Sequence, residues 1–405
     1  MKSICGKVIS MTKYSDFDVT IDRRNTNCAK WDSLAKKYGK NDLIHLGVAD
    51  MDFQAPRPIL DAMQKVIEHG ILGYTDLNDA FYSSIENWVF KKTGIKILKE
   101  WIVFCPRINI ASSVCVESIT QEDGHVIINA PAYSPLVDAI VKNKRTAIMN
   151  PLKRIDDRFV MDFDHLEKIV NDQSEMFILV NPDNPSGRAW SKEELNQLAV
   201  FCKKHHLILF SDEIHADILA KDVEYTSALT LLNQLDNKVI YANSLTKTFN
   251  IPGVIVSYMV IPDPQIRQKV EAEIDRIGMH NPNIFSLAAV EAGYSACDTW
   301  LASLNSYIDA NEAFVREYMS QHMPKFHILP REGTYLLWID CSKLGISEEK
   351  LEQWFIEQAK VEVYMGSKFG KEGRGYIRVN LATSKSRLDE ALLRMKNKYT
   401  LLDTI

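Results

Sequence analysis

The segment Leu207-Ile-Leu-Phe-Ser-Asp212-Glu-Ile-His215 decides how we interpret the fold, together with a later segment, Val239-Ile-Tyr-Ala-Asn-Ser244-Leu-Thr-Lys247. Each begins with a short apolar run, typical of a buried strand, and continues into polar residues. Open α/β sheets bind their ligands beyond the carboxyl ends of the strands. We therefore expect Asp212 and Lys247 to lie together at one edge of a sheet.

Other apolar runs extend this pattern from about residue 100 onward. Val126-Ile-Ile-Asn129 and Met176-Phe-Ile-Leu-Val180 have the length of buried strands and alternate with helical patterns. Ser191-Lys-Glu-Glu194 can form a capping box that starts one such helix, whose apolar face consists of Leu195, Leu198, Ala199 and Cys202. This alternation of strands and helices predicts an α/β fold with a largely parallel sheet.

The pattern changes after about residue 290, where long amphipathic stretches surround an apolar segment at 334–340 and a glycine-rich stretch at 366–375. A chain of 405 residues is also too long for one ordinary core. We predict a large domain at 55–289 and a smaller α+β domain at 290–405. An N-terminal segment at 1–54 is expected to join the smaller domain. The cleft between the domains is the expected site, with 366–375 as a mobile loop over it.

The composition excludes several classes of protein. A net charge of -5 gives no electrostatic footprint for nucleic acid or an acidic membrane surface. Seven cysteines without a Cys-x-x-Cys pair argue against both a disulfide framework and a zinc site. No apolar run approaches the ~18 residues of a membrane span, and Met1 to Lys7 has no apolar signal core. These features predict a cytoplasmic protein with no metal, nucleic-acid or membrane partner.

The pairing of Asp212 with Lys247 is what a pyridoxal phosphate (PLP) site requires. A lysine holds this cofactor as a Schiff base, and a carboxylate keeps the pyridine nitrogen protonated so that the ring accepts electrons. Ser244 lies three residues before Lys247, where its hydroxyl could face the phosphate. Each residue alone has an ordinary alternative, because most lysines are solvated surface charges and an aspartate often caps a helix.

Seven segments resemble, in order and spacing, the fold-type I PLP enzymes, and among them the aminotransferase-like carbon–sulfur lyases typified by cystathionine β-lyase of the MalY/PatB group. They are Gly47-Val-Ala-Asp-Met-Asp-Phe53, Gly73-Tyr74, Ala130-Pro-Ala-Tyr133, Asn181-Pro-Asp-Asn184-Pro-Ser-Gly187-Arg188, Ser211 to His215, Ser244 to Gly253, and Gly375-Tyr-Ile-Arg378-Val-Asn-Leu-Ala382. The resemblance covers roughly residues 40 to 390. It implies a mostly parallel seven-stranded sheet between helices, and a PLP cofactor.

The resemblance also implies roles for individual residues. Lys247 would be the Schiff-base lysine and general acid/base, Asp212 the partner of the pyridine nitrogen, and Asn184 a donor to the ring hydroxyl. Tyr133 would stack on the cofactor, and Tyr74 would reach the phosphate of a neighbouring subunit, which implies a homodimer with shared active sites. The residues alone also allow turn chemistry at Asn184-Pro, a packed Tyr133 and a core position for Tyr74.

Arg378 would bind the α-carboxylate of an amino acid substrate, because a planar guanidinium donates two parallel hydrogen bonds. A surface arginine on an edge strand is the alternative, but the apolar neighbours of Arg378 favour the functional role. His215 stands where aspartate aminotransferase-like enzymes have tyrosine, which supports the lyase branch and a place beside the cofactor. Arg107 departs from the usual glycine-containing loop, and either binds the phosphate or points away from it. Ile255 stands where many aminotransferases have a phosphate-binding arginine.

The predicted activity is β-elimination from an amino acid with a sulfur leaving group, such as cystathionine or a cysteine conjugate, to give pyruvate, ammonia and a thiol. An aminotransferase would use the same Lys247, Asp212 and Arg378. A specialised elimination, cyclisation or replacement reaction on an unusual amino acid stays open because of Arg107. A non-catalytic regulatory protein that keeps PLP for folding is a further alternative.

Overall fold

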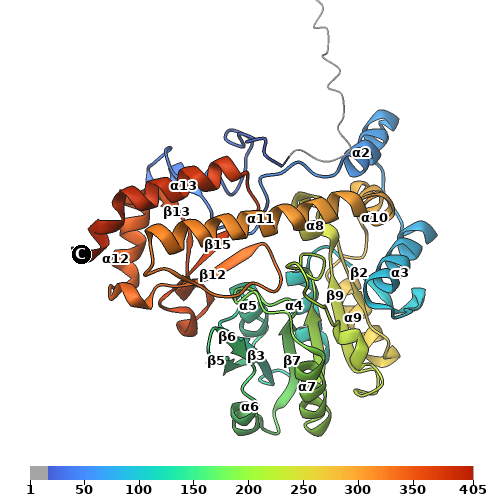
Figure 1. The fold of residues 1–405 in the computed structure, drawn as a ribbon. Helices are drawn as coiled ribbons and strands as arrows, with labels where there is room; N and C mark the ends of the chain where they lie inside the picture. The colour runs from blue at the N-terminus through green and yellow to red at the C-terminus, as the bar shows by residue number, and fades with distance from the viewer. Residues whose placement is uncertain (1–16, 405) are drawn as a thin grey trace, which may run out of the picture.

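The computed structural model describes residues 17–404 (Figure 1). The first sixteen residues of the predicted N-terminal segment 1–54, with the stretch Met1 to Lys7, therefore lie outside the described residues. The main element is a seven-stranded sheet. In spatial order its strands are β2 (Ile102–Cys105), β10 (Ser257–Val260), β9 (Val239–Asn243), β8 (Ile208–Asp212), β7 (Ser174–Val180), β3 (His125–Ala130) and β4 (Thr146–Pro151).

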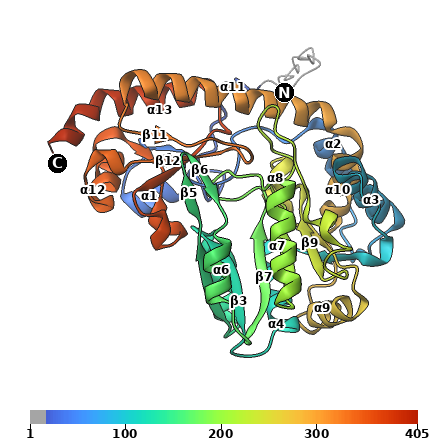
Figure 2. The ribbon, with the colours of Figure 1, turned by 60° about the horizontal axis from the view of Figure 1, so that its bottom comes forward.

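The sheet is mostly parallel, as predicted, because β10 alone runs against its neighbours β2 and β9 among these strands. Successive side chains point to opposite faces of each strand, so that Phe210 packs into one core and Leu209 into the other. On the face of Phe210 lie α4 (Ile108–Ile119), α5 (Ser134–Lys142) and α9 (Pro264–Arg276). On the face of Leu209 lie α6 (Phe163–Ile169) and α7 (Lys192–Lys204), as Figure 2 shows.

Helix α7 forms where the capping box predicted it. The hydroxyl of Ser191 accepts a hydrogen bond from the backbone N–H of Glu194, and the Glu194 carboxylate accepts one from the backbone N–H of Ser191. The predicted apolar face is buried against the sheet.

A second, antiparallel sheet has the order β11 (His327–Ile328), β12 (Leu336–Asp340), β15 (Tyr376–Asn380) and β14 (Tyr364–Met365). Figure 1 shows the long α11 (Asp298–His322) running across the molecule beside α13 (Lys385–Lys398), with α12 (Glu348–Gln353) nearby. Near the N-terminus, β1 (Ile44–His45) pairs in parallel with β13 (Val361–Glu362). Two separate sheets support the division at residue 290, which stays a proposal.

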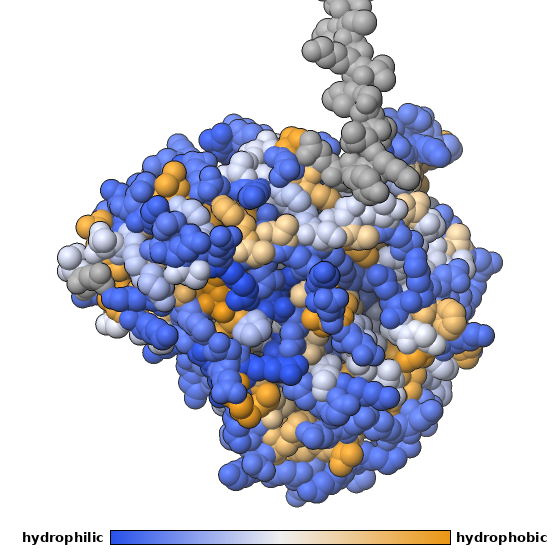
Figure 3. All heavy atoms as spheres, viewed as in Figure 1, coloured by the Kyte–Doolittle hydropathy of each residue, from blue (hydrophilic) through white to orange (hydrophobic). Residues whose placement is uncertain are grey.

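Several further helices and one hairpin complete the fold. They are α1 (Ser33–Tyr38), α2 (Arg57–His69), α3 (Asp79–Thr93), α8 (Leu245–Thr248), α10 (Ile284–Ala296) and the hairpin of β5 (Lys153–Ile155) and β6 (Arg158–Val160). Helices α2 and α3 both pack on α10. The surface in Figure 3 is largely hydrophilic, with scattered apolar residues. In the described part of the chain, no helix has the length and apolar character needed to span a membrane.

The glycine-rich stretch at 366–375 forms two short 3-10 turns, Gly366–Phe369 and Lys371–Gly373, which pack against each other. A β-carbon on Gly366 would lie 1.7 Å from the carbonyl oxygen of Gly373, so neither position has room for a side chain. Close backbone contact therefore explains why positions 366 and 373 are glycine. The mobility of the stretch stays a prediction.

Candidate active site

A cavity of about 130 Å³ lies at the carboxyl ends of β7, β8 and β9. Seven of the nine predicted site residues line it, namely Arg107, Tyr133, Asn184, Asp212, His215, Ser244 and Lys247. The sheet brings them together because parallel strands end at one edge, and each polar residue follows a buried strand or opens the next helix. Arg378 contacts this set through Asn184, whereas Tyr74 lies elsewhere.

Lys247 lies on the one-turn helix α8 that follows β9. Its Nζ donates a hydrogen bond to the backbone carbonyl of Ala49, which also accepts one from the Tyr335 hydroxyl at 3.0 Å. Burial lowers the pKa of Lys247 to about 8, and the carboxylate of Asp50 opposes that shift. The amine is therefore readily deprotonated near neutral pH, as a nucleophile or base requires.

Asp212 is the last residue of β8, and its Oδ1 accepts a hydrogen bond from the backbone N–H of Ile214 at 3.1 Å. Burial raises the pKa of Asp212 to about 7. A cationic group placed against this carboxyl would restore its ionised form. His215 is also buried, and burial lowers its pKa to about 3, so the ring is neutral. The His215 Nδ1 has no hydrogen-bond partner in the described part of the chain, and is free for a ligand.

Arg378 lies on β15 and is only 2% exposed. Its Nη1 donates to Asn184 Oδ1 and its Nη2 to the Gly47 carbonyl, both at 2.8 Å, while its Nε has no partner within residues 17–404. The rings of Tyr364 and Phe369 flank the guanidinium, with centroids 4.9 and 4.8 Å from its central carbon. Burial lowers the pKa of Arg378 to about 10. A buried cation with only neutral partners is suited to receive an anion.

The N-terminus of α4 forms another part of the cavity wall. Arg107 is the N-cap residue, and the first intrahelical bond runs from the Ala111 N–H to its carbonyl, so the N–H groups of residues 108–110 precede that ladder. Such a helix start binds anions. Ser244 caps α8 instead, because its Oγ accepts from the Thr246 N–H at 3.1 Å and donates to the Val256 carbonyl at 2.5 Å. The start of α4 is compatible with the predicted phosphate role of Arg107, whereas the Ser244 hydroxyl would have to turn away from the Val256 carbonyl to donate to a phosphate.

Tyr74 is fully exposed in the connection between α2 and α3 and does not line the cavity. Sequence reasoning missed Tyr335 and the carbonyls of Gly47 and Ala49, which hold Arg378 and Lys247. A tyrosine inside an apolar strand resembles a core residue, and a backbone carbonyl leaves no signal of residue type. Ile255 lines the cavity with a left-handed backbone (φ 59°), which is unusual for a β-branched residue.

These groups fit a flat, phosphorylated pyridine. The carboxyl of Asp212 suits a protonated ring nitrogen, His215 offers an unpartnered ring nitrogen, and the start of α4 with Arg107 suits a dianion. Lys247 supplies an amine with a pKa near 8 for covalent attachment. Fold and site together define the class of fold-type I PLP-dependent enzymes.

Comparisons with known proteins agree with this class. The family model for aminotransferase class I and II matches residues 41–395, and the chain belongs to that family. Cystathionine beta-lyase PatB of Bacillus subtilis (strain 168) is 35% identical over 382 residues, which cover 94% of this chain and 99% of PatB. Protein MalY of Escherichia coli (strain K12) is 29% identical, over 94% of this chain and 98% of MalY.

Among solved structures, cystalysin from Treponema denticola, which contains a pyridoxal 5'-phosphate cofactor, has a TM-score of 0.93 and 30% sequence identity. The match covers 96% of this chain and 99% of cystalysin. The predicted fold class and the predicted resemblance to the MalY/PatB group are therefore confirmed.

Proposed function

We propose that this enzyme is a PLP-dependent lyase that cleaves the β-carbon–sulfur bond of an amino acid. The observation that carries the proposal is a deprotonatable Lys247 in the cavity wall together with a buried Arg378, which contacts the same wall through Asn184 and lacks an anionic partner within the described residues. The similarity to PatB, which is named a cystathionine beta-lyase, favours elimination as the reaction. A cystathionine or cysteine conjugate is the proposed substrate class.

The residues that would hold PLP follow from the geometry of the cavity. Lys247 would attach the cofactor, Asp212 would face the pyridine nitrogen, and the amide N–H of Asn184 would donate to the ring hydroxyl, since its Oδ1 already accepts from Arg378. Tyr133 would stack on the ring, and His215 lies beside Asp212 in the same wall. Arg107 would bind the phosphate at the start of α4, and Ser244 would do so at the start of α8 once its hydroxyl turns from the Val256 carbonyl.

PLP, when bound, withdraws electrons from the α-carbon of an attached amino acid. Arg378 binds the α-carboxylate with two parallel hydrogen bonds and so orients the α-hydrogen. The amine of Lys247 takes the α-proton, because burial leaves it neutral above about pH 8. The electron pair left on the α-carbon forms a double bond to the β-carbon as the sulfur leaves with the pair of the C–S bond, and the sulfur takes up the proton that Lys247 removed to give the thiol. Water then hydrolyses the released enamine to pyruvate and ammonia.

An aminotransferase is the second candidate, because the matching family model is that of class I and II aminotransferases and the same residues serve both reactions. Purified, PLP-loaded protein is given L-cystathionine with and without a 2-oxo acid, and Lys247→Ala is the control. Pyruvate, ammonia and homocysteine without the oxo acid support the lyase. Conversion only with the oxo acid supports transamination, and no reaction in either case contradicts both.

We also propose a homodimer in which Tyr74 reaches the phosphate of the partner's site. Tyr74 is fully exposed, and Ile71 and Leu72 beside it are 69% and 61% exposed, so a run of apolar surface faces solvent in one chain. A partner subunit would cover this run. The proposed location is the cytoplasm, which fits six free, buried cysteines among the described residues.

A further inference from the structure

The segment Gly47–Asp52, which we call the strap, contacts both residues that the proposed chemistry uses. The Gly47 carbonyl accepts from Arg378 Nη2 at 2.8 Å, and the Ala49 carbonyl accepts from Lys247 Nζ. On the same side, Asn380 Nδ2 donates to the carbonyls of Val48 and Asp50, each at 2.7 Å. The position of the strap therefore fixes how the guanidinium and the amine are oriented.

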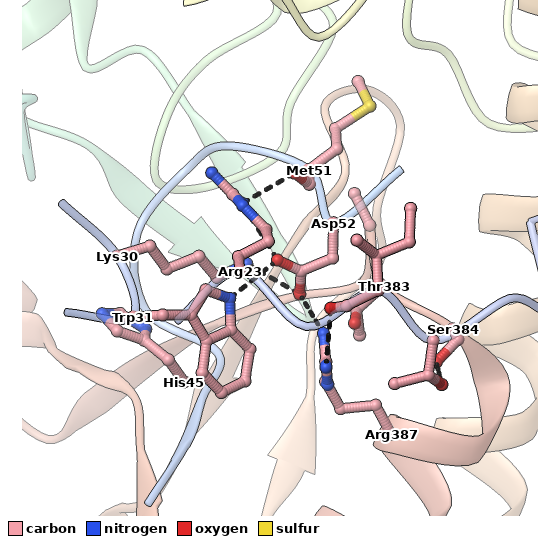
Figure 4. Close-up of polar contacts among 12 residues, drawn as sticks. Arg23, Lys30, Trp31, His45, Met51, Asp52, Thr383, Ser384 and Arg387 are labelled. Atoms are coloured by element: carbon pink, nitrogen blue, oxygen red, sulfur yellow. Dashed lines mark hydrogen bonds and ion pairs between the residues drawn. The ribbon is translucent and has the colours of Figure 1, made fainter. Parts of the chain in front are cut away.

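The other side of the strap is held by an ion-pair cluster around Asp52, which is only 3% exposed (Figure 4). Its carboxylate accepts from Arg23 Nη1 at 3.0 Å, from Lys30 Nζ at 3.2 Å and from Trp31 Nε1 at 3.0 Å. Arg387 Nη1 forms an ion pair with the same carboxylate at 3.2 Å. Three parts of the chain, at 23–31, at the strap and at the start of α13, thus meet at one carboxylate.

Asp50 extends this cluster toward the active site. It pairs with Arg23 at 2.7 Å and lies 3.6 Å from Lys30 Nζ, so the two cations bridge Asp50 and Asp52 across the strap. Asp50 is also the charged group that most strongly opposes the lowering of the Lys247 pKa by burial. The cluster is therefore linked to Lys247 both through the strap backbone and through the charge of Asp50.

Two features of the cluster reduce the stability of the fold, so stability alone does not explain them. The Lys30 side chain is completely buried, and Arg387 lies in the first turn of α13, where the helix dipole disfavours a cation. Buried ion pairs often contribute no more stability than apolar residues of similar volume, but they hold one geometry. This combination favours a role in orientation.

We propose that Lys30 and Arg387, acting through Asp52, are positioning residues that fix the strap against Lys247 and Arg378. This inference rests on the proposed function, since it assigns these two residues to the same site. Loss of either cation loosens one side of the strap, although Arg23 and Trp31 still contact Asp52, and the carbonyls of Gly47 and Ala49 then hold their donors less firmly in one place. A displacement of about 1 Å far from the chemistry can lower activity by up to about a hundredfold.

The test compares Lys30→Met with Arg24→Met in otherwise complete protein. Arg24 is a matched control, because it pairs with Asp22 on the surface and, among residues 17–404, forms no hydrogen bond or ion pair with the strap. Hydrogen–deuterium exchange of the peptide that spans Gly47–Asp52 should be about tenfold faster in Lys30→Met and unchanged in Arg24→Met. In the PLP-loaded protein, the KM for the amino acid should rise about tenfold in Lys30→Met, with a smaller fall in kcat.

Arg387→Gln is the second variant, in case Lys30→Met does not fold, and the same changes are expected from it. Wild-type exchange at the strap in a folded variant overturns the inference, as does an unchanged KM. Faster exchange throughout the chain would mean that the cluster only stabilises the fold, which also overturns it. If the wild type shows no turnover, the proposed function fails, but strap exchange and the reactivity of Lys247 toward an amine reagent still decide the positioning role.

Discussion

Replacing Arg378 with lysine tests the carboxylate site most directly, because the charge is kept while the planar fork is lost. Arg378 donates from two different nitrogens to Asn184 and Gly47, and it is shielded from water between Tyr364 and Phe369. A single ammonium cannot present two parallel N–H groups to a carboxylate and also satisfy both oxygens. We therefore expect weaker substrate binding without loss of the fold.

The expected magnitude follows from the hydrogen bonds lost. One charge-assisted hydrogen bond contributes about 1.5 to 3 kcal/mol, and an incompletely satisfied buried carbonyl adds about 1 kcal/mol. The sum, roughly 2.5 to 4 kcal/mol, corresponds to an increase in KM of about 60-fold to 1000-fold. The low exposure of Arg378 means that solvent screening reduces this value little.

The assay is the initial rate of pyruvate release over a range of L-cystathionine concentrations, together with the binding of an unreactive α-carboxylate ligand. Arg374→Lys is the control, since Arg374 is an exposed arginine four residues away in the same part of the chain. A KM within threefold of the wild type in Arg378→Lys, in folded and PLP-loaded protein, would refute the carboxylate role.

Four further outcomes are expected. Lys247→Ala should lose covalent cofactor attachment, measured by mass spectrometry after borohydride reduction, and nearly all turnover; a reduced adduct at another lysine would contradict the assignment. In cofactor-free protein, the reaction of Lys247 with an amine reagent should be half-maximal near pH 8, because burial lowers its pKa and the neutral amine is lost as the pH falls below that value; a midpoint near 10.5 would contradict this. Asp212→Asn should abolish turnover but raise the melting temperature of cofactor-free protein at pH 8 and not at pH 4. The pKa of Asp212 in the folded protein is raised to about 7, so the wild-type protein loses stability as the pH rises from about 4 to 7. The loss is on the order of 4 kcal/mol at most. An unchanged melting temperature in Asp212→Asn would argue against that shift. Finally, refolding an inactive Tyr74→Ala variant together with inactive Lys247→Ala should restore roughly a quarter of wild-type activity, because half of the dimers are mixed and each has one intact site; no recovery would count against shared sites.

Much of the fold could be predicted because the buried strands carry a strong local signal. The runs at 126–129, 176–180, 207–210 and 239–242 all fall on strands of the main sheet, within two residues of their bounds. The antiparallel β10 was not predicted. Its pairing with β2 joins residues more than 150 positions apart, as in Ser257 with Cys105, and no local pattern specifies such a partner.

The candidate site was predictable where function needs a particular side chain, as at Lys247 and Asp212. It was not predictable where a backbone carbonyl, and not a side chain, makes the contact. A backbone carbonyl is the same in every residue type, and only the folded chain shows that those of Gly47 and Ala49 face Arg378 and Lys247. Long-range ion pairs such as that of Asp52 with Arg387 are hidden for the same reason, since charged residues are common throughout the sequence.

The parallel pairing of β1 with β13 has a consequence for the order of events during synthesis. Residues 44–45 are made before any strand of the main sheet, but their strand partners at 361–362 are made only after all of them. The strands of the main sheet all lie before residue 261, so this sheet can assemble while β1 still lacks its partner strand. Capture of a cofactor by the finished site therefore has to wait for β13, and a chain truncated before β13 should form the large sheet without ever closing the site.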